Sequence, residues 1–186
     1  LYTAFGQNVL AEEEQGIIVL ESEADLAGLP DSLLAAAAAA AVARKMEGKW
    51  LLTNTRSSIE PFLVYSTRRD LREKAWRMWT MRGDNPGEHD NKPVITEILR
   101  LRGEKAQLFG YANYAQFATA DRMAGTPETA MALLQDVWGR VIGPTRTLVT
   151  DLQALAAADG ANFQLAPWDR LYYSEKLRRA RFGLDS

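Results

Sequence analysis

Apolar residues recur at helical spacing along most of this chain, and residues that begin or end helices bound each run. The clearest run follows Thr126-Pro127-Glu128, which combines a capping residue, a first-turn proline and an acid near the positive helix end. Leu134, Val137, Trp138 and Val141 then recur at helical spacing, as on one face of a helix. We therefore predict a mostly α fold, a multi-helix lobe with one small β ribbon.

The same signals predict the other helices. Pro30-Asp31-Ser32 begins one, with Asp31 or Ser32 as its cap, and the alanine run carries it to about Lys45, with Gly48 as a glycine stop. Pro61 suits a first helical turn. The expected helical segments are residues 1–14, 31–45, 61–81, 91–110, 113–120, 126–159 and 168–181.

Further details are predicted within these segments. Asn91 and Asn113 are expected to cap the helices that follow them. Gly143-Pro144 is expected to kink or split its helix, because proline removes a hydrogen bond and clashes with the preceding turn. The last helix carries one apolar stripe, made of Tyr173, Leu177, Ala180 and Leu184.

Two short apolar runs are typical of strands rather than helices. Residues 17–20 read Ile-Ile-Val-Leu and residues 50–53 read Trp-Leu-Leu-Thr. Each is too short for a helix, and the first is rich in β-branched residues. We expect the two runs to pair into the small ribbon.

Composition bounds the kind of protein. A chain of 186 residues is expected to form one domain or one large lobe. Its net charge of -2 gives no reason to expect nucleic acid or an acidic membrane surface as a partner. No run approaches the roughly 20 apolar residues of a membrane span; the nearest, Ala35–Ala41, is followed by Arg44 and Lys45. With no cysteine and no visible signal peptide, we expect a cytoplasmic location.

Metal ligands are scarce in the sequence. It has one histidine, His89, and no cysteine, so an H-E-x-x-H zinc site cannot be written with these residues. His89 lies in a polar loop whose other members are Asp84, Asn85, Glu88, Asp90 and Asn91. The spacing does not match a calcium loop, and Pro86-Gly87 makes an ordinary turn. We expect a solvated loop and a helix cap there, and no metal bound by this chain.

Other candidate sites have structural interpretations. A basic stretch interleaved with Trp76 and Trp79 is typical of single-strand binding, but the tryptophans have helical spacing, which favours burial; its basic residues are Arg68, Arg69, Arg72, Lys74, Arg77 and Arg82. Glu12-Glu13-Glu14 is expected on a solvated face. Serine, histidine and aspartate occur without a G-x-S-x-G elbow.

The most distinctive cluster is Trp168-Asp169 with Tyr172 and Tyr173. Tyrosine hydroxyls can stabilise an oxyanion. The alternative places Tyr173 in the core and uses Asp169 as a helix cap, and we favour it. We therefore predict no catalytic, substrate-binding or metal residue in this chain.

Ordered sequence blocks along nearly the whole chain nevertheless resemble one enzyme family. They include Phe5-Gly6-Gln7-Asn8-Val9-Leu10, Leu101-Arg102-Gly103-Glu104-Lys105-Ala106, Leu108-Phe109-Gly110-Tyr111-Ala112-Asn113-Tyr114, Met123-Ala124-Gly125-Thr126-Pro127 and Pro167-Trp168-Asp169-Arg170-Leu171-Tyr172-Tyr173. Each block alone is weak, and their order is specific. The set resembles the thimet oligopeptidase family of zinc metallopeptidases, in particular its bacterial peptidyl-dipeptidases and oligopeptidases.

The resemblance implies a large helical enzyme with two lobes flanking a channel that admits short peptides to a single zinc. It also implies that the zinc and catalytic residues lie downstream of the Trp168-Asp169 block, beyond Ser186. Since no position here matches a catalytic residue of the family, and the chain begins at Leu1 without a methionine, we expect it to be an upstream, non-catalytic fragment. Its partners would be the remaining catalytic lobe and, in the intact enzyme, short peptides. The alternative is a free-standing helical binding module that has lost the catalytic part.

Overall fold

The computed structural model describes residues 1–183, so Leu184 of the predicted last stripe lies outside the described residues. In chain order the elements are α1 (Tyr2–Gln15), β1 (Ile17–Leu20), the 3-10 turn η1 (Glu23–Leu26), α2 (Asp31–Ala43), β2 (Trp50–Thr53), α3 (Arg56–Tyr65), α4 (Arg69–Thr80), α5 (Lys92–Leu108), α6 (Tyr114–Thr119), α7 (Pro127–Ala158), the 3-10 turn η2 (Pro167–Asp169) and α8 (Arg170–Phe182). The predicted mostly α fold with one small ribbon is confirmed.

The ribbon is antiparallel, with Ile17 opposite Thr53 and Leu20 opposite Trp50. Its pairing is the one predicted from the two short apolar runs. Successive side chains of a strand point to opposite faces. Leu52 accordingly joins the main core, while its neighbour Leu51 borders the alanine-rich face of α2.

The main core lies where α3 and α4 meet the ribbon. Ile59 and Phe62 of α3 are fully buried and pack with Leu71 and Ala75 of α4. Trp76 and Trp79 are partly buried against the same core. Burial therefore explains the tryptophans of the basic stretch, as their helical spacing predicted.

A second, smaller core lies at the other end of the described chain. Leu152 and Ala156 from the last turns of α7 pack on Tyr173 of α8, and Phe163 and Leu165 from the connection between the two helices cover them. The predicted core position of Tyr173, which is 5% exposed, is confirmed.

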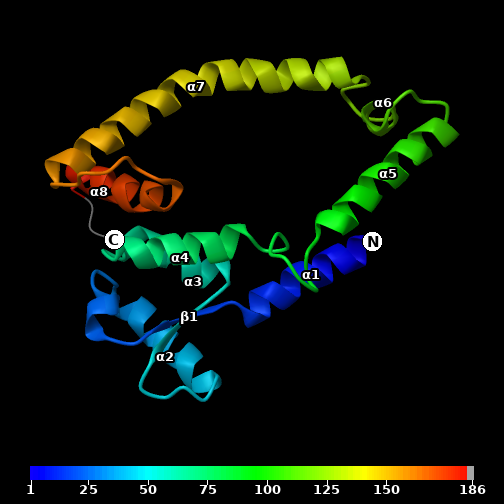
Figure 1. Cartoon of the computed structure of the whole chain (residues 1–186). Coiled ribbons are helices and arrows are strands. Elements are labelled where there is room, and N and C mark those ends of the chain that lie inside the picture. Colours follow the sequence, from blue (N-terminus) through cyan, green and yellow to red (C-terminus); the bar gives the residue numbers. More distant parts are fainter. Residues whose placement is uncertain (184–186) are drawn as a thin grey trace.

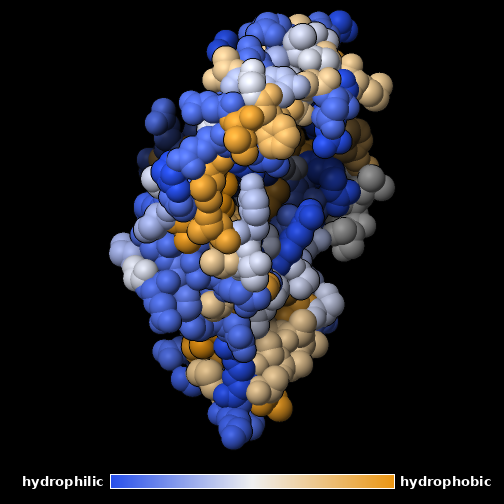
Figure 2. Space-filling model, turned by 90° about the vertical axis from the view of Figure 1, so that its right-hand side faces the viewer, coloured by the Kyte–Doolittle hydropathy of each residue, from blue (hydrophilic) through white to orange (hydrophobic). Residues whose placement is uncertain are grey.

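Helices α5, α6 and α7 form an arch between these two cores. Figure 1 shows α5 starting beside α1, α6 at the corner, and α7 running back above the rest of the molecule to reach α8. On the side of the molecule that carries α5 and α6, apolar residues gather in a band among hydrophilic neighbours (Figure 2). Over residues 1–183, every helix is too short or too polar to cross a bilayer.

Several predicted helix ends are wrong in detail. Helix α2 begins at Asp31 after Pro30, with no side-chain cap, so neither Asp31 nor Ser32 caps it. It ends before Gly48, because Lys45 adopts the left-handed conformation (φ 58°) and the Met46 N–H bonds to the Ala41 carbonyl, as in a Schellman motif. A lysine thus occupies the place that glycine usually takes.

The predicted single helix over 61–81 is two helices. Pro61 lies inside α3 rather than in a first turn, and the chain is extended at Ser66. The Thr67 N–H donates to the Ala27 carbonyl at 3.0 Å, and Ser66 Oγ accepts from the Arg68 N–H. A distant loop therefore satisfies backbone groups that a continuous helix would have paired internally.

Some of the predicted helix caps and breaks are confirmed and others are wrong. Asn113 and Thr126 cap α6 and α7 through their side chains, as predicted. Asn91 precedes α5 but makes no cap bond. Helix α7 is not split at Gly143-Pro144; it is continuous and changes direction along its length (Figure 1).

Replacing Gly28 tests the contact between the η1 loop and the break after α3. Gly28 has φ +87°, and a Cβ there would lie 2.4 Å from the Tyr65 carbonyl oxygen. We expect Gly28→Ala to lower the free energy of unfolding by about 3 kcal/mol, from the left-handed strain plus the clash. Gly48→Ala is the matched control, since Gly48 has φ +81° with open space around it; about 1 kcal/mol is expected. Urea denaturation that gives equal losses would contradict this account.

Candidate functional site

The polar loop that contains His89 is tied together by a lysine. Lys92 Nζ lies 2.8 Å from Asp84 Oδ1 and 3.1 Å from Asp90 Oδ1. The Lys92 N–H also donates to Asp90, and this bond, with the lysine charge, holds the pKa of Asp90 below its usual value. Residues 84–88 are exposed, so the prediction of a solvated loop is confirmed.

The same loop is anchored to α1 by the acidic run. Glu12 Oε2 accepts from the Gly83 N–H at 2.6 Å and from Asn85 Nδ2 at 2.9 Å. Glu13 pairs with Arg82 at 2.9 Å. The prediction of a solvated acidic face is therefore wrong for Glu12 and Glu13, which are half-buried, because their carboxylates satisfy groups of a loop about 70 residues away.

The Asn91 side chain does not cap α5 because it is bonded to α1. Asn91 is 1% exposed. Its Nδ2 donates to the Phe5 carbonyl at 3.1 Å, and its Oδ1 accepts from Asn8 Nδ2 at 2.9 Å. Asn91 thus joins α1 to the start of α5 instead of capping its own helix.

Zinc does not fit the donor set of this chain. The sequence supplies one imidazole and no thiol, and among residues 1–183 no three His, Cys, Asp or Glu side chains lie close enough to bind a metal ion. Two of the carboxylates in the His89 loop, Asp84 and Asp90, already face Lys92.

The basic stretch is largely paired within the molecule. Arg68 contacts Asp25 and Asp70, at 2.5 and 2.8 Å. Arg77 pairs with Glu73 one turn earlier, at 2.8 Å. Arg82 also lies over the Trp79 ring, 3.5 Å from its centroid. These charges serve internal contacts along α4.

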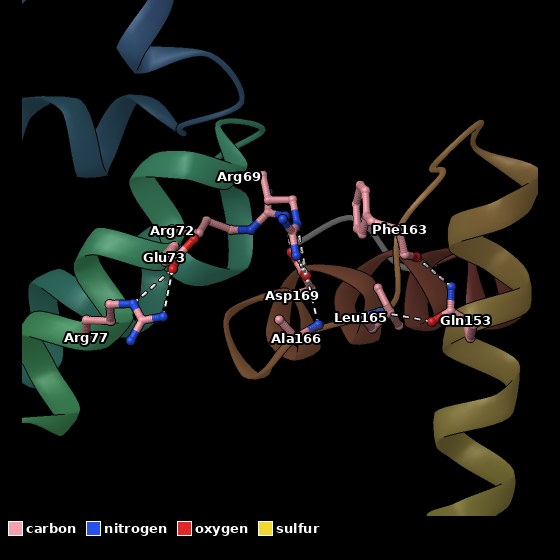
Figure 3. A network of polar contacts seen from close by, with 9 residues as sticks. All are labelled: Arg69, Arg72, Glu73, Arg77, Gln153, Phe163, Leu165, Ala166 and Asp169. Atoms are coloured by element: carbon pink, nitrogen blue, oxygen red, sulfur yellow. Dashed lines mark hydrogen bonds and ion pairs between the residues drawn. The ribbon is translucent and has the colours of Figure 1, made fainter.

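The strongest polar feature of the described chain is the Asp169 cluster, made of Arg69, Arg72 and Asp169. Asp169 is fully buried and Arg72 is 2% exposed. Arg69 Nε and Nη2 donate to the carboxylate at 2.9–3.1 Å, and Arg72 Nη2 donates at 2.8 Å. Figure 3 shows both guanidinium groups reaching from α4 to the single carboxylate of η2. One buried negative charge is therefore shared by two arginines.

Asp169 organises its own turn as well as the contact. Its Oδ2 accepts from the Ala166 N–H at 3.0 Å, whereas it makes no side-chain cap bond to α8. The predicted cap of the last helix is therefore wrong: Asp169 caps η2 instead. Burial by itself would raise the pKa of Asp169, but the hydrogen bonds from Arg69, Ala166 and Arg72 outweigh it, and the pKa is lowered.

Aromatic rings surround the cluster. The Arg69 guanidinium lies 4.1 Å from the Phe163 ring centroid, and that of Arg72 lies 4.2 Å from the Tyr172 centroid. Trp76 and Trp168 pack at 5.7 Å between centroids. Because rings exclude water, the ion pairs act in a low-dielectric setting where an unpaired charge is very unfavourable.

Gln153 connects the cluster to α7. Its Nε2 donates to the Phe163 carbonyl at 3.0 Å, and its Oε1 accepts from the Leu165 N–H at 2.9 Å. Figure 3 shows these bonds on the α7 side of the chain that leads into η2. The side chain replaces backbone partners that the irregular connection lacks.

The contacts of the Asp169 cluster join α4 to η2. Asp169 is saturated by donors, and burial raises the pKa of Tyr173, so its hydroxyl stays protonated. The sequence singled out Trp168-Asp169 but did not reveal Arg69 and Arg72 as partners of Asp169, nor Gln153 as the partner of the connection that leads into η2. The spacing of Arg69 and Arg72, three residues apart on one helix face, was an available signal.

Asp169→Asn tests the cluster. The change leaves a buried Arg72 without its counter-charge, so we expect a loss of about 3–5 kcal/mol in the free energy of unfolding. Asp136→Asn is the matched control: it removes an exposed carboxylate paired with Arg140 at 3.0 Å and should change stability by less than about 0.5 kcal/mol. Chemical denaturation measures both. A loss below about 1 kcal/mol for Asp169→Asn would show that the pair is not needed.

Acid should weaken the fold through Glu175. Hydrogen bonds from Arg178 and Arg179, opposed by partial burial, lower the pKa of Glu175 to about 2. A lowered folded-state pKa gives stability that is present above the unfolded pKa and is lost as the pH falls toward 2. We expect Glu175→Gln to lose roughly 1 kcal/mol of stability at about pH 6 and to lose less than the parent chain on acidification. Identical pH slopes would contradict this role.

Comparisons with known proteins agree with the sequence blocks. A model described as "Peptidase family M3" matches residues 62–186. Oligopeptidase A of Salmonella typhimurium is 38% identical over 184 residues, which are 97% of this chain and 27% of the relative. Dipeptidyl carboxypeptidase of Escherichia coli is 30% identical over 100% of this chain and 27% of the relative. Probable cytosolic oligopeptidase A of Arabidopsis thaliana is 34% identical over 97% of this chain and 27% of the relative. The chain thus spans about a quarter of the length of these relatives.

Proposed function

The chain belongs to peptidase family M3, and from this membership we propose that it is a non-catalytic helical segment of a zinc-dependent metallopeptidase. In that enzyme it would form scaffold and channel wall, as one lobe or part of one. The enzyme would hydrolyse short oligopeptides. Relatives named oligopeptidase A and dipeptidyl carboxypeptidase support this substrate class.

The Asp169 cluster carries the proposal of a scaffold role. It is the most buried charged group of the described chain, and each carboxylate oxygen already accepts from arginine. A catalytic carboxylate must reach the proton that it transfers, whereas Asp169 is 0% exposed and bound by α4. The bonds that Asp169 makes to α4 therefore support a role in holding helices together.

Substrate specificity and compartment are proposed from relatives alone. Two activities remain within the proposal: release of dipeptides from the carboxyl end, and internal cleavage of short peptides. The similarity to a relative named as cytosolic supports a cytoplasmic location.

Zinc binding and peptide hydrolysis test the proposal in two arms. The 186-residue chain alone is expected to retain no stoichiometric zinc after gel filtration and to leave a quenched fluorogenic peptide uncut. The same segment, placed in oligopeptidase A of Salmonella typhimurium instead of the part that it matches, is expected to give a protein whose peptide hydrolysis is inhibited by a zinc chelator. Stoichiometric zinc and zinc-dependent turnover in the chain alone would overturn the proposal.

The open reading frame of the gene distinguishes this proposal from the alternative function, a free-standing helical binding module. A gene that continues into an H-E-x-x-H helix supports the peptidase segment. A stop codon directly after Ser186 favours the module, whose exposed apolar surface would then serve a separate partner.

A further inference from the structure

Helix α7 carries one apolar stripe along its whole length. At 3.6 residues per turn, residues three, four or seven apart share a face, and seven apolar positions of α7 follow these spacings. They are Met131, Leu134, Trp138, Val141, Leu148, Leu152 and Ala156. The ion pair between Asp136 and Arg140 lies on another face of the helix.

The two ends of this stripe have different surroundings. Leu152 and Ala156 are buried, at 2% and 0% exposure, against Tyr173 of α8. Toward the N-terminus the same face is bare. We call this part the α7 stripe; its members, all large hydrophobics that are exposed, are Met131, Leu134, Trp138, Val141 and Leu148.

Nothing else in the described chain covers the α7 stripe. The shallow apolar hollow at its centre is lined by residues of α7 alone, from Met131 to Val141. Figure 1 shows this part of the helix running apart from α4 and the ribbon. Contiguous exposed apolar surface of this kind marks an interaction site.

We propose that the α7 stripe packs against the part of the M3 peptidase that lies outside these 186 residues, and that it extends the core formed by Leu152, Ala156 and Tyr173. This inference rests on the proposed function. Two observations support it. The stripe is continuous with a face that is already an interior interface, and most of the length of the curated relatives has no counterpart in this chain.

The chemistry of the stripe fits such an occupant. Its side chains are apolar, with Gln135 as a polar neighbour at the hollow, so a matching surface would be an apolar helix or sheet face rather than a charged ligand. A tryptophan flanked by aliphatic side chains at helical spacing is suited to ridge-into-groove packing against a second helix.

A pair of neighbouring leucines provides a matched test. Leu134 lies on the stripe and is 62% exposed, whereas Leu133 is 66% exposed and points away from it by about 100°. In the oligopeptidase A chimera, hydrogen exchange over residues 128–150 should be at least tenfold slower than in the chain alone. Leu134→Asp with Trp138→Asp should abolish that protection, and Leu133→Asp should change it by less than twofold.

The outcomes separate this inference from the proposed function. If hydrogen exchange over α7 is slowed in the chimera but the chimera does not hydrolyse peptide, the inference stands and the proposed function is wrong. A chimera that hydrolyses peptide and exchanges rapidly over α7, or that responds equally to Leu133→Asp and Leu134→Asp, overturns the inference alone.

The 186-residue chain by itself gives a second measurement that does not depend on the chimera. Sedimentation should show a monomer with rapid exchange over residues 128–150, and Leu134→Asp should leave its unfolding midpoint unchanged. A dimer that Leu134→Asp dissociates and Leu133→Asp does not would mean that a second copy covers the stripe, and would overturn the proposal.

Discussion

The ion pairs of Asp169 with Arg69 and Arg72 are the contact on which the arrangement of this chain depends. They join residues 97 to 100 positions apart, because the chain that leaves α4 returns to it only at η2. Apolar packing of Trp76 on Trp168 brings these elements together. The forked contact of Arg69 and the single bond from Arg72 to the same carboxylate fix their register. A buried ion pair is weak evidence of net stability, but it strongly disfavours arrangements that leave its charges unpaired.

The arch between α4 and η2 follows from that contact. Its near end is attached to α1 by Asn91 and by the acidic run, and its far end packs on α8. Between these ends, the first two-thirds of α7 extend over the molecule with the apolar stripe exposed (Figure 1). The chain belongs to family M3 and covers about a quarter of its relatives, which fits the proposal that other parts of a peptidase complete this core.

Helix signals that act over three or four residues were predictable from the sequence. Thr126 and Asn113 cap their helices because the acceptor and the backbone N–H that it satisfies are in the same turn. Asn91 and Glu12 carry equally local signals and were misjudged. Their side chains bond instead to groups 71 to 86 residues away, and no local pattern contains those partners.

Most of the helices, the ribbon pairing and the family could be predicted from the residues alone, since these depend on periodicity, capping chemistry and ordered blocks of residues. The sequence also determined that no paired histidines are present to bind zinc. Three features became visible in the folded chain alone: Asp169 binds two arginines of α4, the 61–81 segment breaks at Ser66, and one end of the α7 stripe is buried while the other is exposed. Each of these is set by a partner distant in sequence, whose hydrogen bonds or apolar surface outweigh local preference by a few kcal/mol at most.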